Sequence, residues 1–324
     1  MAKTIISEER ALKDKECIEK IISNIETVIV GKRKVVEMTV LCLLAKGHIL
    51  IEDVPGVGKT SLVLALARSI DCPHKRIQFT PDIMPSDITG FSIYNQKTGE
   101  FEFREGSAMS NMILADEINR ASAKTQSALL EVMEERQVTV DSHTYKMDSP
   151  YMVLATQNPL ESMGTYRLPE AQVDRFMIKL SIGYPEHKDE VNILMNVEEA
   201  KKTISSVTTK DEVNALIEDA ENVKVSKLVA SYIVSMVAAT RKHMDIKLGS
   251  SPRGAICLQA MARAYALLSG RNYVTPDDVK AMAPYVLTHR ISLTNGAKNE
   301  KKKAEDIISE IIKNTIVPVA SEEE

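Results

Sequence analysis

A glycine-bearing turn between an apolar run and a helix-forming run has the residue types that bind phosphate groups. Residues 49–51 predict a strand, residues 62–67 favour a helix, and Gly56 and Gly58 lie between them. Glycine adopts positive φ readily, so successive amides can point at phosphate oxygens beside a helix N-terminus. The predicted cradle comprises Pro55, Gly56, Val57, Gly58, Lys59, Thr60 and Ser61.

Lys59 and Thr60 complete this turn with complementary side chains. The ammonium of Lys59 would neutralise β- and γ-phosphate charge, and the hydroxyl of Thr60 would ligate Mg²⁺. The pattern G-x-x-x-x-G-K-[ST] requires its first glycine at position 53, where this chain has Asp53. An ordinary glycine-rich turn is the alternative interpretation. The intact Gly-Lys-Thr between a strand and a helix favours nucleotide binding.

An acidic pair, Asp116 and Glu117, follows the apolar run at 112–115, which predicts a buried strand. Parallel sheets place ligand chemistry at the carboxyl ends of their strands. Asp116 would hold the Mg²⁺ shell, and Glu117 would orient and deprotonate the attacking water. A solvated strand end is the alternative interpretation. The distance from Lys59, about one βαβ unit plus an insertion, favours hydrolysis.

Another apolar strand at 151–156 ends in Gln157, Asn158 and Pro159. The uncharged amide of Asn158 could hydrogen-bond the γ-phosphate and the attacking water together. Pro159 is consistent with a strand that stops there. An Asn-Pro turn is the alternative interpretation of the same residues.

Arg253 and Arg175 are the two cations to consider. Ser251 is a good N-cap and Pro252 a good first helical residue, so the helix dipole disfavours a cation at Arg253. A phosphate bound at that helix end would reverse the balance, whereas an exposed arginine near an N-cap is the alternative. Arg175 stands directly before the last expected strand, where a locally paired structural arginine is a fair interpretation.

Taken together, these motifs resemble those of the MoxR family of AAA+ ATPases. They occur in the family's order and span nearly the whole chain. The matching segments are 52–60, 79–82, 85–90, 116–121, 155–159, 168–176 and 251–253. Two positions depart from the family pattern. The family tolerates Asp53 in place of the glycine, and Arg167 stands where proline is more usual.

The resemblance implies an ATPase with ATP and Mg²⁺ as its cofactors, in which Thr60 and Asp116 hold the metal. It makes Arg253 a second sensor that reaches the γ-phosphate from a lid. Arg175 becomes an arginine finger inserted into the neighbouring subunit's site, which implies a homo-oligomeric ring, a hexamer. Arg120 is a candidate for a second contact across that interface. The segment that ends in Val30 and Gly31 would close over the adenine.

Alternating helix and strand patterns up to residue 182 predict an α/β fold. We expect a P-loop AAA+ parallel sheet wrapped by helices at 1–184, followed by an all-helical lid domain at 185–324. Hairpin inserts near 91–105 and 137–147 resemble family insertions that face a central pore, and residues 183–185 form the expected hinge. Helices are expected at 187–199, 209–220, 226–243, 251–268, 275–290 and 303–315.

Composition narrows the remaining possibilities. The 324 residues are 44% hydrophobic and 27% charged, enough for a large core in two domains, and the net charge of −4 gives no general attraction to nucleic acid or anionic membrane. The four cysteines are far apart and form neither a zinc nor a disulfide pattern, which suits a reducing compartment. No apolar run reaches the ~18 residues of a membrane span, and the N-terminus lacks a signal peptide's apolar core. We therefore expect a soluble cytoplasmic protein.

Four function classes remain in competition. The first is a chaperone-like remodeller of protein clients, since family members often work with von Willebrand factor A domain proteins. The second is a nucleic-acid motor, whose relatives carry basic pore hairpins, whereas the turns at 95–100 and 141–144 are not basic. A GTPase-like switch lacks an N-K-x-D motif. A non-hydrolysing scaffold would not need Glu117, Asn158 and Arg175.

Overall fold

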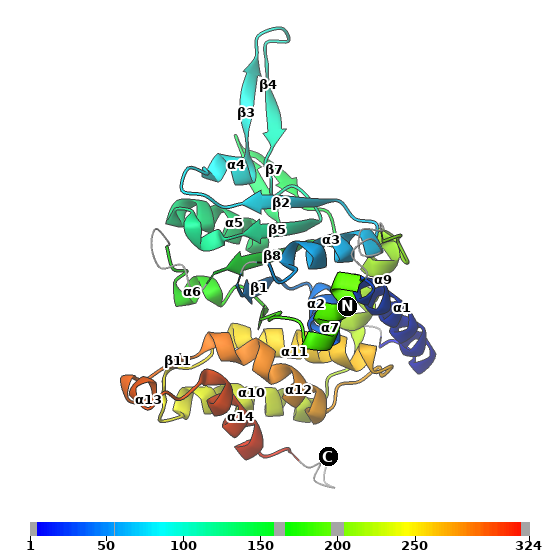
Figure 1. Ribbon diagram of the computed structural model, residues 1–324, viewed down its shortest axis with the longest axis vertical. Coiled ribbons are helices and arrows are strands. Elements are labelled where there is room, and N and C mark those ends of the chain that lie inside the picture. The colour runs from blue at the N-terminus through cyan, green and yellow to red at the C-terminus, as the bar shows by residue number, and fades with distance from the viewer. Residues whose placement is uncertain (1–4, 55, 159–165, 196–203, 319–324) are drawn as a thin grey trace.

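The computed structural model describes residues 5–54, 56–158, 166–195 and 204–318, arranged as a sheet layer and a helical layer (Figure 1). Within these residues, five parallel strands form one sheet in the order β2-β5-β8-β1-β9. The strands are β1 (Ile49–Glu52), β2 (His74–Gln78), β5 (Met112–Asp116), β8 (Met152–Gln157) and β9 (Ile178–Leu180). The predicted parallel sheet is thus confirmed.

The order of the strands brings the expected site residues to one edge. β5 and β8 are buried on both faces, which explains their nearly continuous apolar runs. β1 pairs in parallel with β8 on one side and β9 on the other, while the chain itself leaves β1 for the distant strand β2. The carboxyl end of β1 is therefore a topological switch point, where open sheets bind ligands.

Helices on the sheet layer begin where local sequence signals place them. In α1 (Glu8–Glu26), the hydroxyl of Ser7 accepts a hydrogen bond from the amide of Arg10, and isoleucines at helical spacing face the core. The helix ends shortly before Val30 and Gly31. The other helices here are α2 (Arg33–Leu44), α3 (Lys59–Ser69), α4 (Pro85–Thr89), α5 (Ala123–Glu135) and α6 (Glu170–Val173).

Both expected hairpin inserts are present. β3 (Gly90–Asn95) pairs with β4 (Glu100–Glu105), and this hairpin projects far from the sheet layer (Figure 1). β6 (Gln137–Val140) pairs with β7 (His143–Lys146). The rings of Phe103 and Tyr145 stack with their centroids 3.9 Å apart, so the two inserts support each other.

The helical layer follows the predicted periodicity closely. Its helices are α7 (His187–Met195), α9 (Lys210–Asn222), α10 (Lys227–Lys242), α11 (Pro252–Leu268), α12 (Pro276–Leu287), α13 (Asn295–Asn299) and α14 (Ala304–Asn314). The last part of the helix expected at 187–199 lies outside the described residues. The helix expected to reach 290 changes to the 3-10 turn η2 (Thr288–Arg290).

One feature of this layer was not expected. β10 (Ile246–Leu248) and β11 (Ser292–Leu293) form a short antiparallel pair within the otherwise helical lid. Strands of three and two residues are too short to show an alternating pattern. The pairing therefore depends on tertiary contact alone.

The two layers share a hydrophobic core. One cluster of buried side chains includes Ile21 of α1, Leu41 of α2, and Leu258 and Met261 of α11. Helices α1 and α2 pack directly on α11. The division between 1–184 and 185–324 remains our proposal for the domain boundary, and the parts on either side of it are held together by this apolar packing.

Candidate nucleotide site

The phosphate loop has the backbone conformation that its glycines predict. Gly56 has φ +86° and Gly58 has φ +91°, and Gly58 is the N-cap of α3. A Cβ at either position would meet nothing within 4 Å. Glycine is therefore required here by backbone conformation and not by crowding, and the loop's inner side is open to a ligand. Pro55 lies outside the described residues.

Lys59, Thr60 and Ser61 form the first turn of α3, at the positive end of the helix dipole. The ammonium of Lys59 donates hydrogen bonds to the backbone carbonyls of Asp53 at 3.1 Å and Val54 at 3.3 Å. Lys59 thus lies across the base of the loop, where its charge adds to that of the helix end.

Asp53, the residue in place of the first glycine, has a definite structural role. Its Oδ2 accepts hydrogen bonds from the amides of Ile182 at 2.6 Å and Gly183 at 2.7 Å and from the Ser181 hydroxyl at 3.1 Å. Its Oδ1 accepts a hydrogen bond from the amide of Val54 at 3.0 Å. The carboxylate therefore ties the start of the phosphate loop to the segment after β9, which glycine could not do.

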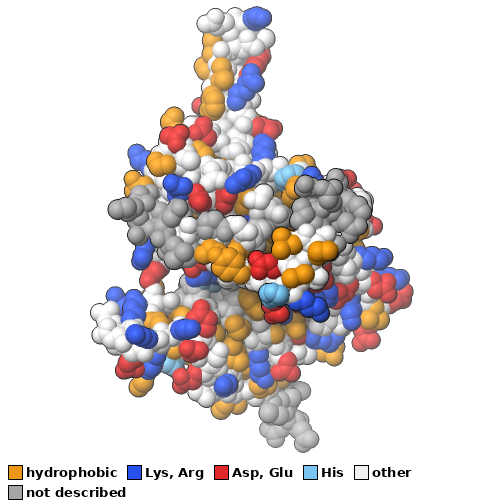
Figure 2. All heavy atoms as spheres, viewed as in Figure 1, with side chains coloured by type: hydrophobic (Ala, Val, Ile, Leu, Met, Phe, Trp, Pro, Cys, Tyr) orange, Lys and Arg blue, Asp and Glu red, His pale blue; other side chains and the backbone are white. Residues whose placement is uncertain are grey.

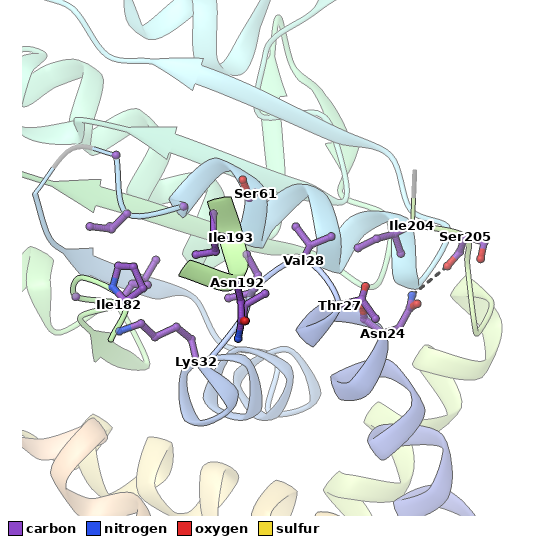
Figure 3. Close-up of a pocket in the computed structure, with 17 residues that line it drawn as sticks. Asn24, Thr27, Val28, Lys32, Ser61, Ile182, Asn192, Ile193, Ile204 and Ser205 are labelled. Carbon is purple, nitrogen blue, oxygen red and sulfur yellow. Dashed lines mark hydrogen bonds between the residues drawn. The ribbon is translucent and has the colours of Figure 1, made fainter. Parts of the chain in front are cut away.

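A cavity of about 690 Å³ lies beside this loop, a suitable size for a nucleotide (Figure 3). The end of α1 and the following turn, the loop glycines, the segment after β9 and one face of α7 surround it. Its lining includes Thr27, Val28, Ile29, Val30, Lys32, Gly56, Val57, Gly58, Ser61, Ile182, Gly183, Asn192 and Ile193. Val30 thus lines this cavity, and its contact with a nucleotide base stays a prediction.

Packing and backbone conformation both require glycine at position 31, next to the cavity residue Val30. Gly31 has φ +73°, and a Cβ there would collide with the carboxylate of Asp189 at the start of α7. α7 therefore approaches the chain closely at Gly31. Lys32 also lines the cavity, and its ammonium donates a hydrogen bond to the Tyr184 carbonyl at 2.7 Å. This bond joins the turn after α1 to the segment after β9.

Sequence reasoning missed the lining contributed by α7. Asn192 and Ile193 face the cavity from this helix, as Figure 3 shows. The helical periodicity of 187–199 predicted the helix but gave no indication of what it covers. Only the path of the chain after Gly183 brings this helix over the cavity.

Asp116 is buried at the end of β5 and already has two partners. Its Oδ2 pairs with Arg76 Nη2 at 2.6 Å, and its Oδ1 accepts a hydrogen bond from the Thr156 hydroxyl at 2.7 Å. The same hydroxyl oxygen accepts a hydrogen bond from the amide of Glu117 at 2.9 Å. Thr156 of β8 therefore fixes both acidic residues relative to the sheet.

Glu117 adopts an unusual backbone conformation and is held by two side chains. Its φ of +56° lies in the left-handed region, which is costly for a non-glycine residue and recurs at functional sites. Its Oε2 accepts hydrogen bonds from Gln78 Nε2 and Arg120 Nη1, each at 3.0 Å. Arg120 is thus an intrachain partner of Glu117 in this structure.

Arg76 and Gln78 were not predicted, although both engage the acidic pair. They are two residues apart on β2, so their side chains leave the same face of the strand. Arg76 also donates a hydrogen bond to Gln78 Oε1 at 2.9 Å, which links the two acids through one polar chain. Alternation along β2 could have indicated this shared face, but not its position beside Asp116.

Asn158 lies at the carboxyl end of β8, next to the strand of Asp116. It is buried, and the register that pairs Ala115 with Ala155 and Ile51 with Thr156 places it at the same sheet edge as the phosphate loop and the acidic pair. Pro159, which follows it, lies outside the described residues.

Arg175 and Arg253 lie together and share one carboxylate. Arg175 Nε is 3.5 Å from Glu134 Oε2, and Arg253 pairs with Oε1 of the same residue at the end of α5. Among the described residues that line the cavity, neither arginine appears. The roles expected for them at a γ-phosphate remain predictions, and the structure adds that they form a pair.

Comparison with known proteins agrees with this geometry. Residues 48–178 match the ATPase family associated with various cellular activities (AAA), and residues 238–311 match the AAA lid domain. The chain is 42% identical to Chaperone MoxR1 of Mycobacterium tuberculosis over 310 residues, which cover 93% of this chain and 82% of that protein. The chain belongs to the MoxR family of AAA+ ATPases.

Other relatives extend the similarity of this MoxR-family ATPase. YeaC of Bacillus subtilis is 52% identical over 302 residues, which cover 93% of this chain and 94% of that protein. The chain in a crystal structure from Cytophaga hutchinsonii is 40% identical in sequence to this one. The two structures superpose with a TM-score of 0.89 over 96% of this chain and 98% of that chain. The AAA+ fold and ATPase class expected from sequence are thereby confirmed. Within the described residues, the helices are all too short or too polar to cross a membrane.

Proposed function

We propose that this MoxR-family ATPase hydrolyses ATP with Mg²⁺ as a homo-oligomeric ring, a hexamer, and uses the cycle to remodel protein partners in the cytoplasm. The observation that carries the proposal is the meeting of the phosphate loop and the acidic pair at one sheet edge. The loop follows β1, Asp116 ends β5 and Glu117 follows it, and β8 lies between those strands in register with both.

The residues at this edge fit ATP and Mg²⁺. Backbone amides of the loop would hold the phosphates, and the cavity beside Val30 would take the base and ribose. The Thr60 hydroxyl and the Asp116 carboxylate are hard oxygen donors of the kind that Mg²⁺ prefers. When bound, Mg²⁺ would neutralise charge on the phosphate oxygens. Arg76 supplies positive charge to Asp116 in this structure.

Glu117, Asn158 and Lys59 supply the remaining polar groups at this edge, and each has a proposed role in hydrolysis. Glu117 would accept the proton of the attacking water, and Asn158 would orient that water and the γ-phosphate. Lys59 would move its hydrogen bonds from the carbonyls of Asp53 and Val54 to phosphate oxygens. This exchange requires little rearrangement, because Lys59 already lies at the loop.

The arginine pair supports a ring. Arg175 and Arg253 both rest on Glu134, which neutralises part of their charge, and they are absent from the described lining of the chain's own cavity. Arginines that lie outside their own chain's cavity are available to reach the nucleotide site of a neighbouring subunit. There an arginine finger stabilises the charge of the transition state. We propose that Arg175 acts in trans and that Arg253 accompanies it.

The projecting hairpin supports protein partners over nucleic acid. Its exposed side chains include Phe91, Ile93, Tyr94 and Phe101, and apolar atoms run along one edge of the projection (Figure 2). Residues 90–105 contain two basic and three acidic side chains, so the hairpin offers phosphates little attraction. Proteins with von Willebrand factor A domains are the partner class that we propose.

The first experiment tests hydrolysis at Glu117. Glu117→Gln removes the base but keeps the shape, so ATP affinity should remain while turnover falls by about 10² or more. Lys59→Ala should instead weaken ATP binding. Glu218→Gln, an exposed change on α9, is the matched control and should leave both unchanged. Native turnover in Glu117→Gln would refute the role of Glu117.

The second experiment tests the ring. Arg175→Ala should bind ATP normally and lose most hydrolysis, in line with the contribution of about 10³ or more that arginine fingers make. Adding Lys59→Ala subunits, which keep Arg175, should restore part of the activity when subunits exchange. A mixture that stays inactive despite demonstrated exchange would show that Arg175 acts within its own chain.

A further inference from the structure

Arg290, in the 3-10 turn after α12, has a completely buried side chain. A guanidinium without solvent requires hydrogen-bond partners for its N–H groups. Nε donates to Asp174 Oδ1 at 2.9 Å, and the terminal nitrogens donate to the carbonyls of Asp174 at 3.1 Å, Phe176 at 2.6 Å, Met177 at 2.9 Å and Val286 at 2.5 Å. Of these partners, Val286 belongs to the same helical segment, while the others lie before β9.

Three of these hydrogen bonds are made to the residues on either side of Arg175. Asp174 precedes it and Phe176 follows it, and both backbone carbonyls point to the guanidinium of Arg290. His289 lies within 3.0 Å of the Phe176 carbonyl as well. The side chain of Arg175 extends instead toward Glu134. The backbone around Arg175 therefore has its conformation set by a residue of the lid.

Asp174 extends the connection to Arg253. Its Oδ2 accepts a hydrogen bond from the Ser251 hydroxyl at 2.9 Å, while its Oδ1 binds Arg290. Ser251 is the N-cap of α11, the helix that presents Arg253 in its first turn. One carboxylate thus joins Arg290 to the helix that carries Arg253.

Ser251 differs from the other serine and threonine N-caps described here. At Ser226, for example, the hydroxyl accepts a hydrogen bond from the Val229 amide at 3.2 Å and caps α10. Ser251 makes no side-chain cap bond to α11. Its hydroxyl is directed to Asp174, although capping would stabilise the helix.

We infer that Arg290 is a positioning residue that holds Arg175 and Arg253 as one unit attached to the lid. The inference rests on the proposed function, in which Arg175 acts on a neighbouring subunit. Any displacement of the lid then moves both arginines together, so the lid's position controls their approach to the neighbouring site. A purely structural role for Arg290 would instead affect folding and nucleotide binding in the subunit that carries the change.

Arg290→Lys tests this directly, because lysine keeps the charge but cannot reproduce the planar set of N–H donors. We expect ATP affinity to remain near native and turnover to fall more than about tenfold, since small misplacement of a catalytic group is costly. Adding Lys59→Ala subunits, which keep Arg290 and Arg175, should restore part of the turnover. Reduced ATP affinity without restoration would overturn the inference.

Ser251→Ala is the second variant, in case Arg290→Lys does not fold. It should lower turnover several-fold with little change in Tm, because the lost hydroxyl holds Asp174 and does not cap α11. Ser226→Ala is the matched control. It removes a working cap and should lower Tm by a few degrees without changing turnover. If Ser251→Ala lowers Tm and leaves turnover unchanged, the inference fails.

The outcomes separate this inference from the proposed function. Native turnover in both Arg290→Lys and Ser251→Ala, with Arg175→Ala inactive, would overturn the positioning role and leave the ATPase proposal intact. Native turnover in Arg175→Ala would instead remove the trans role of Arg175, and with it the basis for assigning Arg290.

Discussion

The carboxylate of Asp53 accepts a hydrogen bond from the backbone amide of Gly183 at 2.7 Å. This contact joins the phosphate loop to the segment through which the chain leaves the sheet for α7. Because Gly183 also lines the cavity, the loop and the cavity wall on the lid side share one hydrogen-bonded carboxylate. A displacement of that wall would therefore also displace the carboxylate of Asp53 at the start of the loop.

Asp53→Gly would restore the common loop spacing but should destabilise the protein. The amides of Ile182 and Gly183 would lose their acceptor, and a buried unpaired donor costs about 1–3 kcal/mol. We expect a lower Tm in thermal unfolding and weaker ATP binding. Asp53→Asn keeps one acceptor oxygen, so its Tm and ATP affinity should lie between those of the native protein and those of Asp53→Gly. A Tm at or above the native value in Asp53→Gly would contradict this account.

Gln78→Ala should raise turnover measured without a protein partner. Gln78 donates a hydrogen bond to Glu117 Oε2, and this bond occupies an oxygen that would otherwise be open to the attacking water. Its loss leaves Arg120 on Glu117 and should increase basal turnover several-fold at unchanged ATP affinity. Gln96→Ala, at the exposed hairpin tip, is the control. A fall in turnover would indicate that Gln78 orients Glu117 productively.

Nucleic acid should bind weakly. The hairpins lack a basic surface, so we expect binding to single- or double-stranded DNA no tighter than about 10⁻⁴ M at physiological salt. Turnover should not respond to DNA. Fluorescence anisotropy over a salt series would measure both affinity and slope. Micromolar binding with a steep slope, or strong stimulation, would favour the nucleic-acid motor.

Asp14 provides a test of pH dependence. Burial in α1, together with the nearby Asp219 carboxylate, raises the pKa of Asp14 to about 6, although Arg10 opposes the shift. The folded protein therefore binds this proton more tightly than the unfolded chain does. The contribution of Asp14 to stability is greatest below about pH 4 and is lost as pH rises to about 6.

Asp14→Asn should consequently stabilise the protein at pH 8, by about 1–3 kcal/mol. Asparagine resembles the protonated carboxyl, since its amide can donate to Asp219. The difference from the native protein should shrink between pH 6 and pH 4. Urea unfolding at pH 5 and pH 8 measures it, with the exposed neighbour Glu16→Gln as control. Destabilisation at pH 8 would show that pairing with Arg10 outweighs burial.

Local patterns were sufficient for much of this protein. Gly56 and Gly58 stand where the backbone needs positive φ, and apolar runs before Asp53, Asp116 and Asn158 predicted buried parallel strands. The lid helices followed from their helical periodicity. These features could be predicted because each depends on residues within a few positions of one another.

Tertiary structure decided the partners of these residues. Asp53 binds amides 129 and 130 residues away, and Arg290 encloses the backbone of a segment more than 110 residues earlier. The side chains on β2 reach Asp116 and Glu117 only because the sheet order puts β2 beside β5. No periodic pattern encodes such contacts, since they depend on how distant elements pack. The sequence by itself determined the chemical groups of the site, and the packing of sheet and lid determined which groups hold one another in place.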